Sequence, residues 1–146
     1  AEALLASDAQ ITVAELGPGI VTWAKGPLAP VFKGCLDDPR VTIVVKDVGQ
    51  LIAEAKAGYD AILLDVDNGP EGLSRPGNDR LYSAKGLAAA KAALRPGGSL
   101  AVWSAYPDDA FTKRLKQAGF EAEEVKARAN GKRGGARHLI WLVRRS

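Results

Sequence analysis

The sequence has almost none of the residues that build covalent or metal-based sites. It contains one cysteine, Cys35, one histidine, His138, and no methionine at all. A single cysteine excludes an internal disulfide framework and any cysteine-rich zinc site. A metal ion would have to be bound by carboxylates alone, and we expect no metal site. A chain without disulfides suits a reducing compartment, so we expect a cytoplasmic protein.

Long apolar runs are missing as well. No stretch approaches the roughly 20 residues that a membrane-spanning helix needs. No basic region leads into an apolar stretch near the N-terminus, so no signal peptide is visible and no membrane association is expected. Because methionine is absent even at position 1, either a leader has been removed or these residues are the C-terminal part of a longer chain.

The chain has the composition of one globular domain. Its 146 residues are 47% hydrophobic and 25% charged, which are ordinary values for a folded domain. We therefore treat residues 1–146 as a single nucleoside-binding domain of the Rossmann type, for the reasons that follow.

Positive charge is concentrated at the C-terminal end. Residues 126–146 hold seven Lys or Arg and no acid, whereas the first 125 residues have a net charge of −4. Such a segment can contact the phosphates of a nucleic acid. A solvated hairpin with Lys and Arg at its edges is favoured, because aromatic residues that could stack on bases are sparse there.

Apolar strands alternate with helical segments along most of the sequence. Strands are predicted at 11–16, 41–47, 60–66 and 99–105, followed by a hairpin of two strands at 120–129 and 137–144. Near-continuous apolar strands separated by helices are typical of a parallel sheet that is covered on both faces. The predicted fold class is α/β, with a doubly wound, mostly parallel sheet and a C-terminal antiparallel hairpin.

Acidic residues stand at the ends of the first three predicted strands. They are Glu15, Asp47 and Asp65, and Asp67 follows just beyond. In such sheets ligands bind outside the carboxyl ends of the strands. An acid at one strand end typically accepts hydrogen bonds from ribose hydroxyls, and others can accept from an adenine amino group or take a proton from an amine. The alternative is that each acid only caps a turn or helix. The matching positions favour a common site.

The segment "AELGPG" (14–19) could also be the glycine-rich loop after the first strand of a dinucleotide-binding fold. That loop would need a further glycine near Val21, followed by a strand that ends in an acid about 20 residues on. Position 21 is not glycine, and nothing strand-like lies between Val21 and Asp38. The strand at 11–16 is therefore better explained as the second strand of the sheet. The first strand and its glycine loop are then expected upstream of residue 1.

Two stretches, "YDAILLDVDNGPEG" (59–72) and "LYSAKGLAAAKAALRPGGSLAVWS" (81–104), resemble the later half of the spermidine synthase-like proteins. These form the polyamine aminopropyltransferase branch of the class I S-adenosylmethionine-dependent methyltransferase superfamily. The resemblance covers about residues 11–144. It implies a methyltransferase-like fold, S-adenosylmethionine or its decarboxylated form as co-substrate, and transfer of an aminopropyl group to a small-molecule amine.

The resemblance also implies roles for individual residues. Glu15 would bind the ribose of the co-substrate, and Asp47 with Val48 would bind its adenine. Asp65 would accept the proton of the attacking amine. In the substrate site, Asp67 would hold a cationic amine and Tyr82 would form a wall.

The loop after Asp65 lacks the paired hydroxyl residues that polyamine aminopropyltransferases usually carry, so the acceptor stays open. One alternative is a methyltransferase that acts on a small molecule or on RNA. Another is a non-catalytic binding or dimerisation module of the same fold, and a homodimer is left open. His138 is expected to be a packed or surface residue, and Trp23, Trp103 and Trp141 are expected in the core or at its rim.

Overall fold

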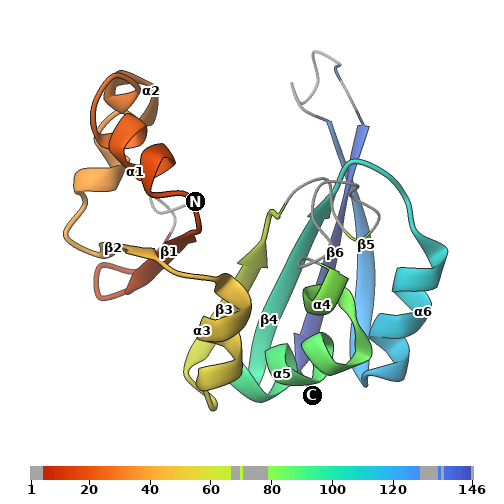
Figure 1. Ribbon diagram of the computed structural model, residues 1–146. Helices are drawn as coiled ribbons and strands as arrows, with labels where there is room; N and C mark the ends of the chain where they lie inside the picture. Colours follow the sequence, from red (N-terminus) through yellow and green to blue (C-terminus); the bar gives the residue numbers. More distant parts are fainter. Residues whose placement is uncertain (1–4, 67–69, 71–78, 129–134, 136, 146) are drawn as a thin grey trace. The chain divides into compact units, whose positions relative to one another are not determined.

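The computed structural model describes residues 5–66, 70, 79–128, 135 and 137–145. Contacts divide the chain into two compact units, Ala1–Leu51 and Ile52–Ser146. Figure 1 shows the elements of both units with their labels. Each unit is described by itself below.

The first unit is built around two parallel strands, β1 (Ile11–Glu15) and β2 (Val41–Val45). They pair from Ile11 with Val41 to Glu15 with Val45. Three short helices connect them: α1 (Pro18–Lys25), α2 (Ala29–Phe32) and the 3-10 helix η2 (Cys35–Asp37). Proline at the first helical position of α1 is favourable, because its missing N–H has no partner there in any helix. This parallel crossover matches the predicted alternation of strand and helix.

Two expectations for the first unit are wrong in detail. The sequence of residues 1–7 predicts the last turns of a helix, but residues 5–7 are not helical. Trp23 was expected in or beside the core, but its side chain on α1 is 63% exposed. The helical period alone does not tell which apolar side chain of a short helix is covered.

Arg40 lies just before β2 and hydrogen-bonds to residues at the start of the described chain. Its Nη2 donates to Asp38 Oδ2 at 2.7 Å, and its Nη1 donates to the carbonyl oxygens of Leu5 and Ala6 at 3.3 and 3.0 Å. The backbone N–H of Arg40 donates to Asp38 Oδ1 as well. The side-chain hydrogen bonds from Arg40, and then its backbone hydrogen bond, lower the pKa of Asp38 from 3.8 to about 2.

This pair predicts a defined pH dependence in the first unit. Because the pKa of Asp38 is depressed on folding, its contribution to stability is complete above about pH 3.8 and is lost as the pH falls through about 2. In Arg40→Ala the pKa of Asp38 is expected to rise toward its ordinary value. Titration of the Asp38 carboxyl carbon by NMR measures this, and an unchanged midpoint in the variant would contradict it. Arg40→Lys, which keeps the charge but not the forked donor, is expected to be intermediate.

The second unit is a four-stranded mixed sheet with the order β3-β4-β6-β5. Its strands are β3 (Tyr59–Leu64), β4 (Leu94–Ser104), β5 (Phe120–Arg128) and β6 (Arg137–Arg145). Strand β3 is parallel to β4, whereas β6 is antiparallel to both β4 and β5. The predicted antiparallel pair at the C-terminal end is therefore confirmed, although most of its predicted turn, "NGKRGG", lies outside the described residues.

The core of this unit lies between one face of the sheet and the helices α4 (Asp79–Tyr82), α5 (Ala84–Ala93) and α6 (Asp109–Gln117) (Figure 1). Side chains that alternate along β3, β4 and β6 are buried on this face: Ile62, Leu64, Leu100, Val102, Leu139, Trp141 and Val143. The opposite face is more exposed, with Leu63 at 69%. Period-two burial of this kind places the intervening residues on that second face.

The sequence predicts a short helix at 48–57, and the helix that follows β2, α3 (Val48–Glu54), ends earlier. Strand β4 begins at Leu94 rather than at 99, because Leu94 already pairs with Tyr59 of β3. The register of this pair shifts between Tyr59 and Ala61, whose partners in β4 are Leu94 and Ser99. In the described part of the chain, neither β1 nor β3 has a strand on its second edge. No helix of that part is long and apolar enough to cross a membrane.

Gly86 allows α4 and α5 to approach closely. A Cβ added there would overlap the carbonyl oxygens of Arg80 and Leu81 and would lie 2.7 Å from the Leu81 carbonyl carbon. These are backbone atoms, which cannot move aside as a flexible side chain can.

We therefore expect Gly86→Ala to lower the free energy of unfolding by about 1–3 kcal/mol, the usual cost of overpacking. Urea unfolding followed by circular dichroism measures it. Gly19→Ala is the matched control, because nothing lies within 4 Å of a Cβ added at Gly19. This control is expected to be neutral or slightly stabilising, and equal losses in both variants would contradict the packing argument.

Candidate active site

Glu15 is the last residue of β1, and its side chain is half-buried. Its Oε1 accepts a hydrogen bond from the backbone N–H of Gly17 at 2.7 Å. Within the described residues, Oε2 has no hydrogen-bond partner. The bend from the strand into α1 therefore orients the carboxylate and leaves one oxygen available to accept hydrogen bonds from a ligand.

Asp47 lies between β2 and α3, and its side chain is exposed. Its Oδ1 accepts from the backbone N–H groups of Gly49 at 2.7 Å and Gln50 at 3.4 Å. Asp47 thus caps the start of α3, where Val48 is the first residue. The cap uses one carboxylate oxygen, so it is compatible with a second role for the other.

Glu15 and Asp47 lie at the same end of the first unit. The carbonyl oxygen of Glu15 accepts from the N–H of Lys46 at 3.1 Å, directly after the last paired residues of β1 and β2. Both acids therefore stand at the carboxyl ends of two adjacent parallel strands. This is the edge at which parallel α/β sheets bind their ligands.

Asp65 follows β3 directly and is exposed. Leu64, the last residue of β3, pairs with Val102, so Asp65 stands at the carboxyl end of the parallel pair β3–β4. No hydrogen bond or ion pair of Asp65 occurs within the part of the chain that the structure describes. Asp67 lies outside the described residues. That Glu15, Asp47 and Asp65 share one edge stays a prediction, because they belong to different units.

Tyr82 is a buried residue that holds the chain just after Asp65. Its side chain is 2% exposed, and its hydroxyl donates to the carbonyl oxygen of Val66 at 3.2 Å. Its ring packs edge-to-face on Phe111, with centroids 5.6 Å apart. The hydroxyl thus fixes the chain one residue after Asp65.

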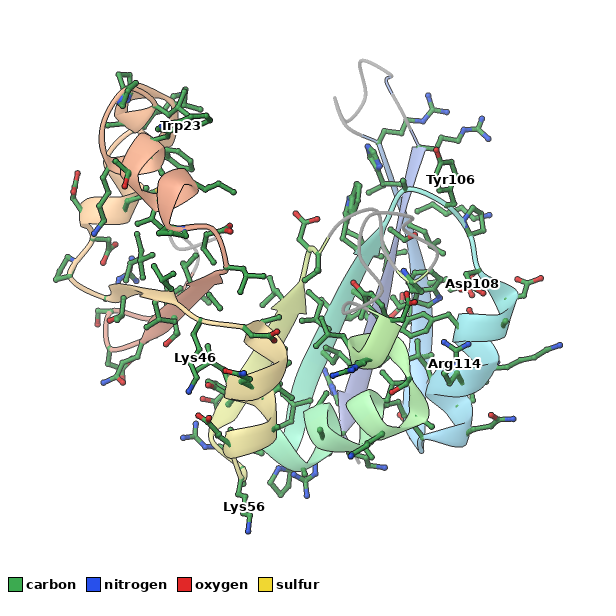
Figure 2. The ribbon with its side chains drawn as sticks, viewed as in Figure 1. Trp23, Lys46, Lys56, Tyr106, Asp108 and Arg114 are labelled. Carbon is green, nitrogen blue, oxygen red and sulfur yellow. The ribbon has the colours of Figure 1, made fainter. Side chains whose placement is uncertain are left out.

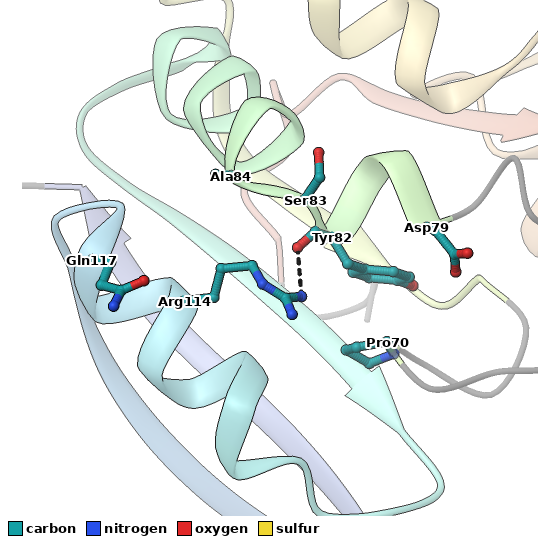
Figure 3. Close-up of a pocket in the computed structure, with 7 residues that line it drawn as sticks. All are labelled: Pro70, Asp79, Tyr82, Ser83, Ala84, Arg114 and Gln117. Atoms are coloured by element: carbon teal, nitrogen blue, oxygen red, sulfur yellow. Dashed lines mark hydrogen bonds between the residues drawn. The ribbon is translucent and has the colours of Figure 1, made fainter.

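An open pocket of about 510 Å³ lies beside Tyr82 and is lined by residues of α4, α5 and α6 (Figure 3). Arg114 extends from α6 toward α4 (Figures 2 and 3), and its Nη1 donates to the carbonyl oxygen of Tyr82 at 3.0 Å. Asp79 lines the pocket from α4. No local pattern in the sequence predicts this pocket, because Asp79 and Arg114 belong to no motif and are far apart in the chain.

The described residues contain no group of three His, Cys, Asp or Glu side chains that could hold a metal ion.

Replacing Tyr82 by Phe keeps the ring contact with Phe111 and removes the hydroxyl. We expect a loss of about 0.5–1.5 kcal/mol in the free energy of unfolding, the usual net worth of one hydrogen bond. Hydrogen exchange is expected to be faster around Val66, where the anchor is lost. Chemical unfolding and exchange mass spectrometry measure the two effects. Tyr106→Phe, at an exposed tyrosine, is the control and is expected to show neither.

Comparison with known proteins agrees with the resemblance noted in the sequence. The model of the spermine/spermidine synthase domain matches residues 5–112. A polyamine aminopropyltransferase of Mycobacterium tuberculosis is 37% identical over 101 residues, which are 67% of this chain and 18% of the relative. The chain spans between 18% and 32% of the length of the curated relatives that it matches.

Solved structures show the same fold. Spermidine synthase from Thermotoga maritima superimposes with a TM-score of 0.70 at 15% identity, over 94% of this chain and 46% of that one. A methyltransferase from Pyrococcus furiosus reaches 0.61 at 17% identity, over 94% and 63% of the two chains. The predicted α/β fold of the class I methyltransferase type is confirmed.

Proposed function

Because this chain belongs to the spermine/spermidine synthase family, we propose that it is part of an aminopropyltransferase. The co-substrate would be decarboxylated S-adenosylmethionine, and the acceptor a small-molecule amine. Asp65, exposed at the carboxyl end of β3, carries the proposal, since it is an acid without a structural partner among the described residues. The single cysteine favours the cytoplasm as the compartment in which the protein acts.

Glu15 and Asp47, the acids of the first unit, would bind the nucleoside part of the co-substrate. Glu15 is held by the N–H of Gly17 through one oxygen, so its other oxygen can accept hydrogen bonds from the ribose hydroxyls. Asp47 is held by the start of α3 and can accept from the adenine amino group, beside Val48. Carboxylates that are already oriented lose little freedom when they bind a ligand.

Asp65 would act as the proton acceptor in the transfer. The amine nitrogen forms a bond to the terminal carbon of the aminopropyl group as the bond from that carbon to sulfur breaks. The sulfur keeps the electron pair, and the proton of the amine passes to the Asp65 carboxylate. The sulfonium supplies the leaving group, so the protein mainly positions the amine and removes its proton.

The test replaces Asp65 by Asn in the complete protein. The amide is nearly isosteric, so nucleoside affinity should persist, while turnover should fall by a factor of about 10²–10⁴, the usual worth of a general base. The assay offers 1,4-diaminobutane and related amines with the decarboxylated co-substrate, and S-adenosylmethionine with the same acceptors. Normal turnover in Asp65→Asn would refute the role of Asp65.

Glu15→Ala tests nucleoside binding instead of proton transfer. It should weaken nucleoside binding by about 1.5–3 kcal/mol, the worth of hydrogen bonds to a charged acceptor, as measured by titration calorimetry. Asp60→Asn is the matched control for the loss of an acid in β3, because Asp60 pairs with Arg95 at the other end of the strand. It should leave turnover unchanged. Turnover with S-adenosylmethionine alone would indicate methyl transfer instead.

A further inference from the structure

Strand β5 forms one outer edge of the four-stranded sheet. In the described part of the chain, no strand lies beside this edge, and no backbone hydrogen bond joins β5 to an element other than β6. Such an edge has a row of N–H and C=O groups that can pair with another chain. With nine residues, β5 offers a longer edge than a typical strand of about five or six.

The charged side chains of β5 are divided between its two halves. Acids stand in the first half and bases in the second: Glu121, Glu123 and Glu124, then Lys126 and Arg128. All five are exposed, and none forms an ion pair with another described residue. An antiparallel copy of the strand would place its bases beside these acids, so β5 is complementary in charge to itself.

The geometry of a sheet limits how two copies of β5 can pair. Copies joined edge to edge are related by a two-fold axis perpendicular to the sheet, so the same residues meet on both sides. The axis keeps each side chain on its own face, and successive side chains of a strand alternate between faces. Residues that lie directly opposite each other therefore differ by an even number of positions, and the axis lies between one residue of β5 and its own copy.

Only one position of the axis within residues 121–128 avoids opposing like charges. An axis at any of the five charged residues places that charge opposite its own copy, which is destabilising. An axis at Ala122 brings two acids together, and one at Ala127 brings two bases together. An axis at Val125 instead places Glu124 opposite Lys126 of the second copy, and this pair occurs twice by symmetry.

The side chains around Val125 are accessible and suitably placed for this pairing. Glu124 pairs with the buried Trp141 of β6, so it lies on the helical face, as does Lys126 two residues on. Glu124 Oε1 accepts from Thr112 Oγ1 at 2.6 Å, which orients the carboxylate, and its other oxygen can accept from Lys126 of the second copy. Val125 lies on the opposite face and is 37% exposed, so its own copy would cover this apolar side chain.

We propose that two copies of this chain associate through β5, antiparallel and with the two-fold axis at Val125. The backbone groups of the two edges pair, and the two four-stranded sheets become one continuous sheet. Charged residues on an edge strand usually prevent pairing with other chains. In β5 they oppose the other two-fold registers, so the same charges select a single partner and a single alignment. This association does not involve Asp65 and is independent of the proposed transfer.

The test uses two charge reversals in the complete protein, Glu124→Lys and Lys126→Glu. Each reversal turns both opposite-charge pairs into like-charge pairs, so the dissociation constant of the dimer should rise about 5- to 100-fold. Sedimentation velocity over a concentration series measures this constant. An equal mixture of the two variants restores opposite charges at both pairs, so it should associate about as tightly as the wild-type protein. A folding defect in either variant cannot produce this recovery.

Lys56→Glu is the matched control. It makes the same change of charge at an exposed residue just before β3, which forms the opposite edge of the sheet. It should leave the dissociation constant unchanged. Hydrogen exchange gives a second measurement, because backbone amides of residues 120–128 should exchange more slowly as the wild-type protein associates. At the same concentrations, Lys126→Glu should show no such slowing.

The outcomes decide the inference separately from the proposed function. Weaker association of each reversal together with recovery in the mixture supports pairing through β5. A wild-type protein that stays monomeric across the concentration series overturns it. Association that neither reversal weakens, or that the mixture fails to restore, overturns it as well. None of these results depends on turnover, so Asp65→Asn tests the transfer whether or not the interface exists.

Discussion

A chain of three buried aromatic rings, Tyr82, Phe111 and Trp141, connects the core of the second unit to its candidate active site. Tyr82 packs edge-to-face on Phe111, and Phe111 packs in the same way on Trp141, with centroids 4.9 Å apart. Such pairs add about 0.5–1.5 kcal/mol beyond the burial of their area. The rings come from α4, α6 and β6, so they join elements that are distant in the sequence.

At both ends of this row of aromatic rings, the polar atoms of the side chains form hydrogen bonds. Trp141 Nε1 donates to Thr112 Oγ1 at 2.8 Å, and that hydroxyl donates to Glu124 Oε1 at 2.6 Å. At the other end, the Tyr82 hydroxyl holds the carbonyl oxygen of Val66. A buried polar group without a partner is costly, and here the partner of Tyr82 is the segment that carries Asp65. The packing of the core therefore determines where the proposed base stands.

The acids of the first unit combine a local and a proposed functional role. Glu15 holds the turn after β1 and Asp47 caps α3, each through one carboxylate oxygen. Capping and ligand binding are often treated as alternatives for an acid at a strand end. In these two residues the geometry permits both, because the second oxygen remains available.

The sequence by itself determined the features that depend on neighbouring residues. Short stretches of sequence are enough to predict burial with a period of two, helix caps such as Ser83 and Asp108, and acids after apolar strands. The motifs of the family are also short and local. Only the tertiary structure decided which distant residues meet. Trp103 and His138 stack because β6 pairs with β4 in one register, and Gly86 is required because α4 and α5 turn back closely. Such contacts depend on packing across the sheet, for which no local pattern in the chain provides a signal.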